Sequence, residues 1–113
     1  MKTYSNTQLP TYQISGQELR IHWDAQEVAA PNIGEPRMQW EQNEAVCGLN
    51  DTYDQLVAKI IKSVYDYNAE FAAINDGGEK YAVYQAFRLQ AKALARGWIN
   101  RDEATINWAA LEN

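Results

Sequence analysis

The chain has 113 residues, a formal net charge of −5 and a hydrophobic fraction of 46%, values typical of one globular domain. This composition excludes a disordered or fibrous chain, and the scattered Lys and Arg residues lack the basic footprint that nucleic-acid binding needs. No apolar run is long enough for a membrane span. We therefore expect a single domain over residues 1–113 that binds neither nucleic acid nor membrane and stays in the cytoplasm.

Residues that could carry chemistry are few. Cys47 is the only cysteine and has no histidine or cysteine at ligand spacing, so we expect a buried and inert thiol. His22 is the only histidine and is expected to be exposed on the polar face of a strand. The sequence thus predicts no metal, no cofactor and no catalytic residue. An enzyme would need a composite site between elements, with strongly perturbed titratable groups in a cavity.

Residues 11–23, "TYQISGQELRIHW", alternate apolar and polar side chains on both sides of Gly16-Gln17. This period of two predicts a β-hairpin, because glycine suits the tight turn between antiparallel strands. A lone hairpin is marginally stable, so its apolar face must pack on the helices. Residues 1–10 are a candidate flexible segment. The predicted buried face of the hairpin consists of Tyr12, Ile14, Leu19, Ile21 and Trp23.

Residues 24–35 contain Pro31 and Gly34 and are predicted to be a connector without regular structure. From Pro36 onward the chain is predicted to be helical as far as residue 113. The first helix covers "RMQWEQNEAVC" and is interrupted by Gly48. Its predicted buried stripe consists of Met38, Ala45, Val46 and Leu49.

The two longest predicted helices cover residues 51–75 and 79–97. Asn50-Asp51 provides the start signal of the first, and "NDGG" at residues 75–78 separates it from the second, which makes them antiparallel neighbours. Helical spacing places Tyr53, Tyr67 and Phe71 in the core. A second row of the first helix, centred on Tyr65, is expected to be covered by the hairpin.

The helix over residues 79–97 is expected to bury Tyr84, Phe87 and Trp98 and to end near Gly97. A basic strip along it is expected to make weak surface pairs with Asp51 and Asp54. A leftover row of small and apolar residues is a candidate surface for a protein partner or for self-association. The strip consists of Arg88, Lys92 and Arg96, and the leftover row of Ala82, Ala86, Leu89 and Ala93.

A last short helix is predicted to begin at the cap residue Asn100, with Trp108 anchoring the terminus. The sequence therefore predicts an α+β fold, in which an N-terminal β-hairpin packs on a unit of three to four helices. An antiparallel helical hairpin dominates this unit.

The order of short strands ending in "IHWD", a Pro-containing connector, "QWEQNEAVCGLNDTYDQLVAKII" and "YAVYQAFRLQAKALA" resembles small accessory proteins encoded beside bacteriophage or prophage tail genes. The resemblance covers residues 38–98 and includes a helix with aromatic and basic residues at the spacing of Tyr84, Phe87 and Arg88. It implies a virion component or a tail-assembly factor and supplies no catalytic residue. The chain lacks the tryptophan-rich, proline-flanked segment of tail-fibre assembly factors.

Two functions fit these patterns. The first is a non-catalytic structural or assembly protein, cytoplasmic or virion-associated, that binds other tail or assembly proteins or a second copy of itself. The alternative is a small-ligand-binding or regulatory domain, with a pocket between hairpin and helices lined by Tyr12, Trp23 and Trp40. A filled core between hairpin and helices would favour the first function, and an apolar cavity with converging polar groups would favour the second.

Overall fold

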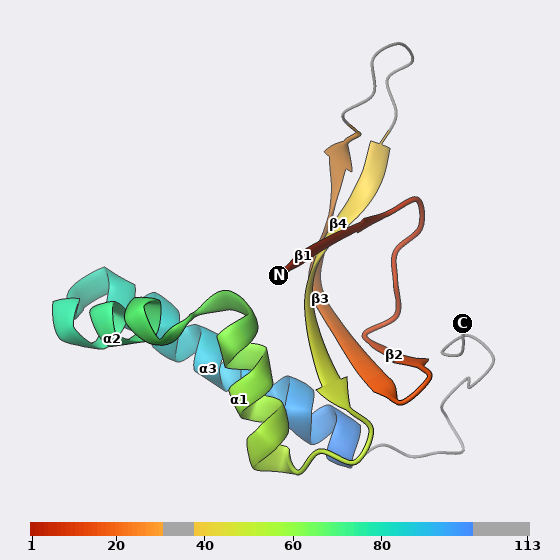
Figure 1. Ribbon diagram of the computed structural model, residues 1–113. Coiled ribbons are helices and arrows are strands. Elements are labelled where there is room, and N and C mark those ends of the chain that lie inside the picture. The colour runs from red at the N-terminus through yellow and green to blue at the C-terminus, as the bar shows by residue number, and fades with distance from the viewer. Residues whose placement is uncertain (31–37, 101–113) are drawn as a thin grey trace.

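The computed structural model describes residues 1–30 and 38–100 and confirms the predicted α+β class. An antiparallel sheet with strand order β1-β4-β3-β2 precedes the helices (Figure 1). The strands are β1 (Lys2–Ser5), β2 (Tyr12–Ser15), β3 (Glu18–Ala29) and β4 (Met38–Gly48), and the helices are α1 (Tyr53–Val64), α2 (Tyr67–Asp76) and α3 (Gly78–Ile99). Residues 31–35 of the predicted connector, the predicted helix start at residues 36 and 37, and the predicted last helix with Trp108 lie outside the described residues.

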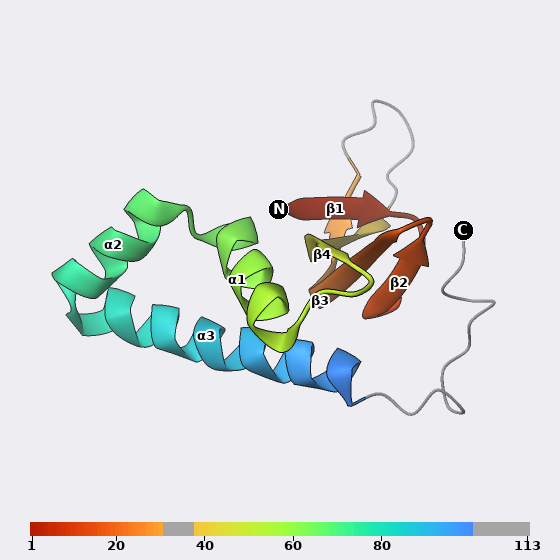
Figure 2. The same ribbon diagram turned by 60° about the horizontal axis from the view of Figure 1, so that its bottom comes forward.

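The helices form an arm that extends away from the sheet. Helices α1 and α3 lie beside the sheet at one end, whereas α2 lies at the far end of the arm and packs on α3 (Figure 2). The core lies where α1 and α3 meet one face of the sheet. Its fully or nearly buried side chains are Leu19, Ile21, Trp23, Ala45 and Cys47 of the sheet and Leu56, Ile60, Ala91, Ala95 and Trp98 of the helices.

The predicted hairpin is confirmed as β2 and β3, joined by a turn in which Gly16 has a φ of +61°. Pairing of Tyr12 with Ile21 and of Ile14 with Leu19 places these side chains on the face that the helices cover. Strand β3 does not end at Trp23, however. It passes an irregularity between Trp23 and Gln26 and continues to Ala29, so residues 24–29 are strand and not connector.

Strands β1 and β4 were not predicted from the sequence. The predicted helix over "RMQWEQNEAVC" is wrong, because residues 38–48 form β4 and pair with both β1 and β3. Its expected buried stripe is wrong as well, since Met38 is 59% exposed and Val46 also faces solvent, while Ala45 is buried. Strand β1 occupies part of the candidate flexible segment over residues 1–10.

The predicted helix over residues 51–75 is broken at Tyr65 and Asp66 into α1 and α2. Helix α1 begins after Thr52, whose hydroxyl accepts a hydrogen bond from the Gln55 N–H in a capping box, and not after Asn50 or Asp51. The carboxylate of Asp66 then accepts a hydrogen bond from the Ala69 N–H, 2.7 Å away, and starts α2 in a new direction.

This break changes which aromatic side chains are buried. Tyr53 and Tyr65 pack against the core, but Tyr67 is 73% exposed and Phe71 is 68% exposed, so their predicted core placement is wrong. The predicted core placement assumed one continuous helix through residues 65 and 66. Because the chain begins a second helix after Asp66, the faces of α1 and α2 are not aligned. The aromatic residues of α2 consequently face solvent.

Helix α3 buries Tyr84 and Trp98 as predicted but continues past Gly97 to Ile99. Gly97 is therefore not the helix cap. A Cβ added at Gly97 would overlap the hydroxyl of Tyr12, which donates a 2.7 Å hydrogen bond to the Leu94 carbonyl oxygen. The missing side chain at Gly97 thus lets β2 pack closely against α3.

The Cys47 thiol is expected to be unreactive in the folded protein. Its side chain is 3% exposed, and burial is the main cause that raises its pKa to about 11. At pH 8 only about a thousandth of the thiol would then be the reactive thiolate. Ellman's reagent at pH 8 should release no thionitrobenzoate from the folded chain and one equivalent in denaturant. Rapid release of one equivalent without denaturant would contradict this burial.

Candidate functional site

A groove of about 510 Å³ lies among the three helices and is the site that we consider functional. All three helices contribute side chains to its lining. Its volume lies within the range of binding sites for ligands or for side chains of a partner. The apolar and aromatic lining residues are Tyr53, Val57, Ala58, Ile61, Tyr65, Tyr67, Ile74 and Tyr84.

Two tyrosines fix the base of the groove. The rings of Tyr65 and Tyr84 meet edge to face with centroids 5.1 Å apart, and Tyr65 also lies 5.7 Å from Phe87. The Tyr84 hydroxyl donates a 2.7 Å hydrogen bond to Glu70 and so ties α3 to α2. Burial first, and then this hydrogen bond, raise the pKa of Tyr84 to about 12, so the phenol is neutral at physiological pH.

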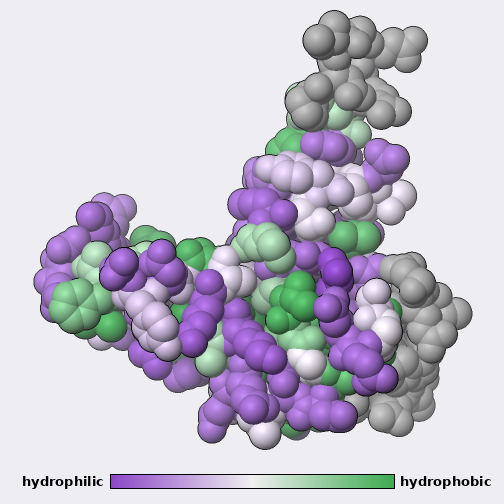
Figure 3. All heavy atoms as spheres, in the orientation of Figure 1, coloured by the Kyte–Doolittle hydropathy of each residue, from purple (hydrophilic) through white to green (hydrophobic). Residues whose placement is uncertain are grey.

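One wall of the groove carries an exposed apolar stripe on α2, formed by Tyr67, Phe71 and Ile74. The spacing of four and three residues places all three side chains on one face of the helix. Ile74 is 50% exposed, and the two aromatic residues are exposed by more than two thirds. Green side chains at the α2 end of the arm are visible among hydrophilic surface in Figure 3. An apolar stripe of this kind is typical of an interaction surface.

The charged side chains around the groove are balanced in sign but unpaired. Three acids, Asp54, Asp66 and Glu70, and three bases, Lys62, Arg88 and Lys92, line it. Among the residues that the structure describes, none of the six forms an ion pair. Lys62 and Arg88 instead lie over the rings of Tyr67 and Tyr84, at 4.7 and 5.9 Å from the centroids.

The predicted pairing of the basic strip with Asp51 and Asp54 is not formed. The Asp51 carboxylate instead lies 2.6 Å from the Lys59 ammonium and accepts a hydrogen bond from the Gly48 N–H. These two contacts, that with Lys59 first, lower the pKa of Asp51. Arg96 of the strip lies over the ring of Tyr53. Asp51 therefore fixes the chain between β4 and α1 and takes no part in the groove.

The predicted partner row of Ala82, Ala86, Leu89 and Ala93 is exposed along its whole length. It occupies the side of α3 that faces away from the core, and Leu89 is 66% exposed. The row does not line the groove. It remains a candidate surface that is separate from the α2 stripe.

The predicted ligand pocket of Tyr12, Trp23 and Trp40 is not brought together. Tyr12 and Trp23 face the helices, where Tyr12 meets Trp98 and Trp23 stacks on Phe87. The Glu44 side chain lies on the face of the sheet that the helices do not cover. Side chains at an even spacing along a strand share a face, so Trp40 lies on that face too. The three side chains therefore cannot line one cavity.

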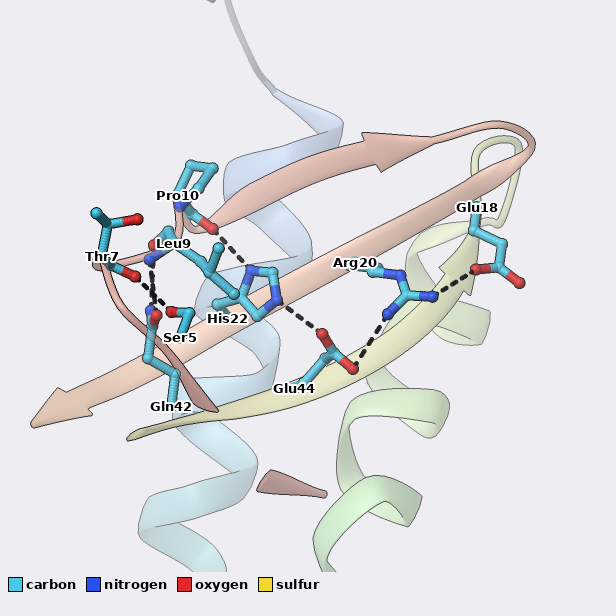
Figure 4. A network of polar contacts seen from close by, with 9 residues as sticks. All are labelled: Ser5, Thr7, Leu9, Pro10, Glu18, Arg20, His22, Gln42 and Glu44. Atoms are coloured by element: carbon cyan, nitrogen blue, oxygen red, sulfur yellow. Dashed lines mark hydrogen bonds and ion pairs between the residues drawn. The ribbon is translucent and has the colours of Figure 1, made fainter. Parts of the chain in front are cut away.

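His22 is buried in a polar network and not exposed as predicted. The segment between β1 and β2 must cross the sheet from one edge to the other, and it covers His22, which is 1% exposed (Figure 4). Nδ1 of His22 lies 2.8 Å from the Pro10 carbonyl oxygen, and Nε2 lies 2.9 Å from Glu44 Oε2. Arg20 contacts the other oxygen of Glu44 at 3.5 Å.

The donors in this network can be assigned from its geometry. A carbonyl oxygen only accepts, so Nδ1 of His22 must donate to Pro10. Without a proton, both Nε2 and the Glu44 carboxylate oxygen are acceptors. Their hydrogen bond therefore requires a proton on one of the two atoms. Nearby, the Gln42 amide both donates to and accepts from the backbone of Leu9. These contacts position the crossing segment, and they include no free nucleophile.

Over residues 1–30 and 38–100, no group of three or more His, Cys, Asp or Glu residues is placed to hold a metal ion. In the same ranges, no helix combines the length and the apolar character that a membrane crossing requires.

No protein-family model matches the chain, and no curated protein or solved structure shows significant similarity to it. The geometry of the groove and the residues that surround it are therefore the features that indicate a function.

Proposed function

We propose that the protein is a non-catalytic assembly protein that binds a partner protein through the groove and the α2 stripe. The exposure of Tyr67 and Phe71 carries this proposal. Fully burying an aromatic or large aliphatic side chain is favourable by about 1.5–3 kcal/mol, and aromatic anchors dominate many protein interfaces. A chain that leaves an apolar helical stripe in water gains stability when a partner covers that stripe.

The groove supports this proposal through its combination of apolar base and charged rim. Tyr65 and Ile61 provide a fixed apolar base, while Lys62, Arg88 and Lys92 stand around it without ion pairs in the described part of the chain. An amphipathic helix that enters such a groove places its apolar anchors inside and its charges on the rim. We infer tail assembly of a bacteriophage or prophage as the setting, because the sequence resembles tail-associated accessory proteins.

A small-ligand function has less support. Leu19, Ile21 and Trp23 of the sheet are packed directly against the helices, which leaves the predicted ligand site between hairpin and helices filled. Among the described side chains in this region, only the Trp23 Nε1 is buried without a hydrogen-bond partner. A ligand site needs several converging polar groups.

Photo-crosslinking from Phe71 tests the proposed function. Benzoylphenylalanine at position 71, expressed in the cells that naturally produce the chain, should form a protein adduct of defined mass. The same residue at position 89 is the matched control, because Leu89 and Phe71 are 66% and 68% exposed. Phe71→Glu should abolish copurification of the crosslinked protein. Adducts from position 89 alone, or from neither position, would contradict a partner in the groove.

A further inference from the structure

We propose that the segment fitting this groove is α2 of a second copy, so that two chains form a symmetric dimer through their helical arms. This inference rests on the proposed function, since it identifies the partner of the same groove. In a twofold-symmetric interface the same patch occurs on both sides and must be complementary to itself. The groove with its α2 wall meets this requirement in polarity and charge.

The polarity requirement is met because the chain carries both an apolar groove and an apolar helix that would fill it. Tyr67 and Ile74 line the groove, whereas Phe71, between them on the same face of α2, does not line it and is 68% exposed beside it. Helix α2 lies at the end of the arm and away from the sheet, so a second molecule can reach it without meeting the strands (Figure 2). Two α2 helices packed side by side would bury both Phe71 rings.

The charge requirement is met by the distribution of signs between the helices. Helix α2 contains two acids, Glu70 and Asp76, and no base. Asp76 is paired with Lys80, so Glu70 is the acid of this helix that lines the groove without an ion pair in the described part of the chain. The facing wall on α3 contributes Arg88 and Lys92, neither of which has an ion pair within the described residues. An α2 helix that packs on the groove of another copy therefore brings Glu70 to bases without ion pairs, and the twofold axis repeats this contact.

The predicted leftover row on α3 lacks this self-complementarity. Ala82, Ala86 and Ala93 are small, and Leu89 is its only large apolar side chain. Two such rows would bury little area, whereas stable interfaces bury about 800 Å² on each partner. The dimer therefore depends on Phe71 and not on Leu89, and this difference makes the two surfaces separable by experiment.

The test measures the mass of the purified full chain by sedimentation equilibrium at about 1–100 μM. The wild-type chain should approach twice the 12.9 kDa of one chain. Phe71→Glu should raise the dimer dissociation constant by about 30-fold or more, which corresponds to an interface hot spot. Leu89→Glu is the matched control with equal exposure and should leave the constant unchanged. Circular dichroism of both variants should match that of the wild type.

Two chains with reversed charges at the groove test the dimer even if the Phe71→Glu variant misfolds. Arg88→Glu with Lys92→Glu gives one chain, and Glu70→Lys gives another. Each should be monomeric alone, because like charges then meet across the axis. An equimolar mixture should recover the dimer mass, a result that two misfolded chains cannot produce. Failure of the mixture to associate would overturn the proposal.

The outcomes separate this inference from the proposed function. A monomeric wild-type chain that still crosslinks from position 71 to a different protein overturns the dimer and leaves the assembly function standing. A monomeric chain without any adduct from position 71 overturns both. A dimer that dissociates in Leu89→Glu but persists in Phe71→Glu would assign self-association to the leftover row on α3.

Discussion

Replacing His22 by alanine is expected to lower the free energy of unfolding by about 1–3 kcal/mol, the usual cost of leaving a buried hydrogen-bonding group without its partner. Glu44 would keep only its longer contact with Arg20, and the Pro10 carbonyl oxygen would lose its donor. Chemical denaturation followed by circular dichroism measures the loss. A change below about 1 kcal/mol would show that the network does not hold the segment that crosses the sheet.

Glu44→Gln is the matched control for this network. A neutral imidazole that donates from Nδ1 to Pro10 keeps a lone pair on Nε2, and a glutamine side-chain amide can donate to it. Both hydrogen bonds survive in this variant, so we expect a loss of only about 1 kcal/mol. Imidazole ¹⁵N shifts should then show the tautomer protonated at Nδ1. The opposite tautomer would contradict the assigned donor to Pro10.

Replacing Gly97 by alanine is expected to destabilise the protein, although alanine normally stabilises a helix relative to glycine. The added methyl group would collide with the Tyr12 hydroxyl and break its hydrogen bond to Leu94. Overpacking of this kind costs about 1–3 kcal/mol. The midpoint of urea denaturation should fall without a change in the slope of the transition.

In the Tyr12→Phe background, Gly97→Ala should change the free energy of unfolding in the opposite direction. Without the hydroxyl, the nearest atom to the new Cβ is the ring carbon Cζ at 3.4 Å, an ordinary contact. Gly97→Ala should then stabilise the chain by up to about 1 kcal/mol, the usual helix preference of alanine. A double-mutant cycle measures this coupling. Purely additive effects would show that Tyr12 and Gly97 do not meet.

The hairpin was predictable from the sequence and β4 was not. Gly16 between two alternating segments is a local signal that the folded chain retains. The segment "MQWEQNEAVCG" is rich in Glu and Gln, which favour helix, but it pairs on one side with β3 and on the other with β1. Strand β3 precedes β4 across residues 30–37, which were predicted mostly as connector, and β1 lies at the start of the chain. Pairing with both strands overrides the local preference.

The groove among the helices was not predicted. The sequence assigned Tyr84, like Tyr67 and Phe71, to the core, and it placed Arg88 and Lys92 on a basic surface strip. The error at Tyr67 and Phe71 has one cause, since the helical wheel was continued through Asp66. An aspartate followed by "YNAE" is an adequate start signal for a new helix. Using this signal would have predicted a separate second helix, whose apolar stripe need not face the core. The direction of α2 relative to the sheet depends on long-range packing, which a local sequence pattern does not show.

The close packing of β2 against the end of α3 has a consequence for biosynthesis. Tyr12 and Leu94 are separated by 82 positions, so this contact cannot form until almost the whole of α3 has been translated. Until then the nascent sheet has no α3 cover over Ile21 and Trp23, and such surfaces promote aggregation. Chaperones are therefore expected to engage ribosome-bound chains that stop before α3, and to release them once Trp98 is in place.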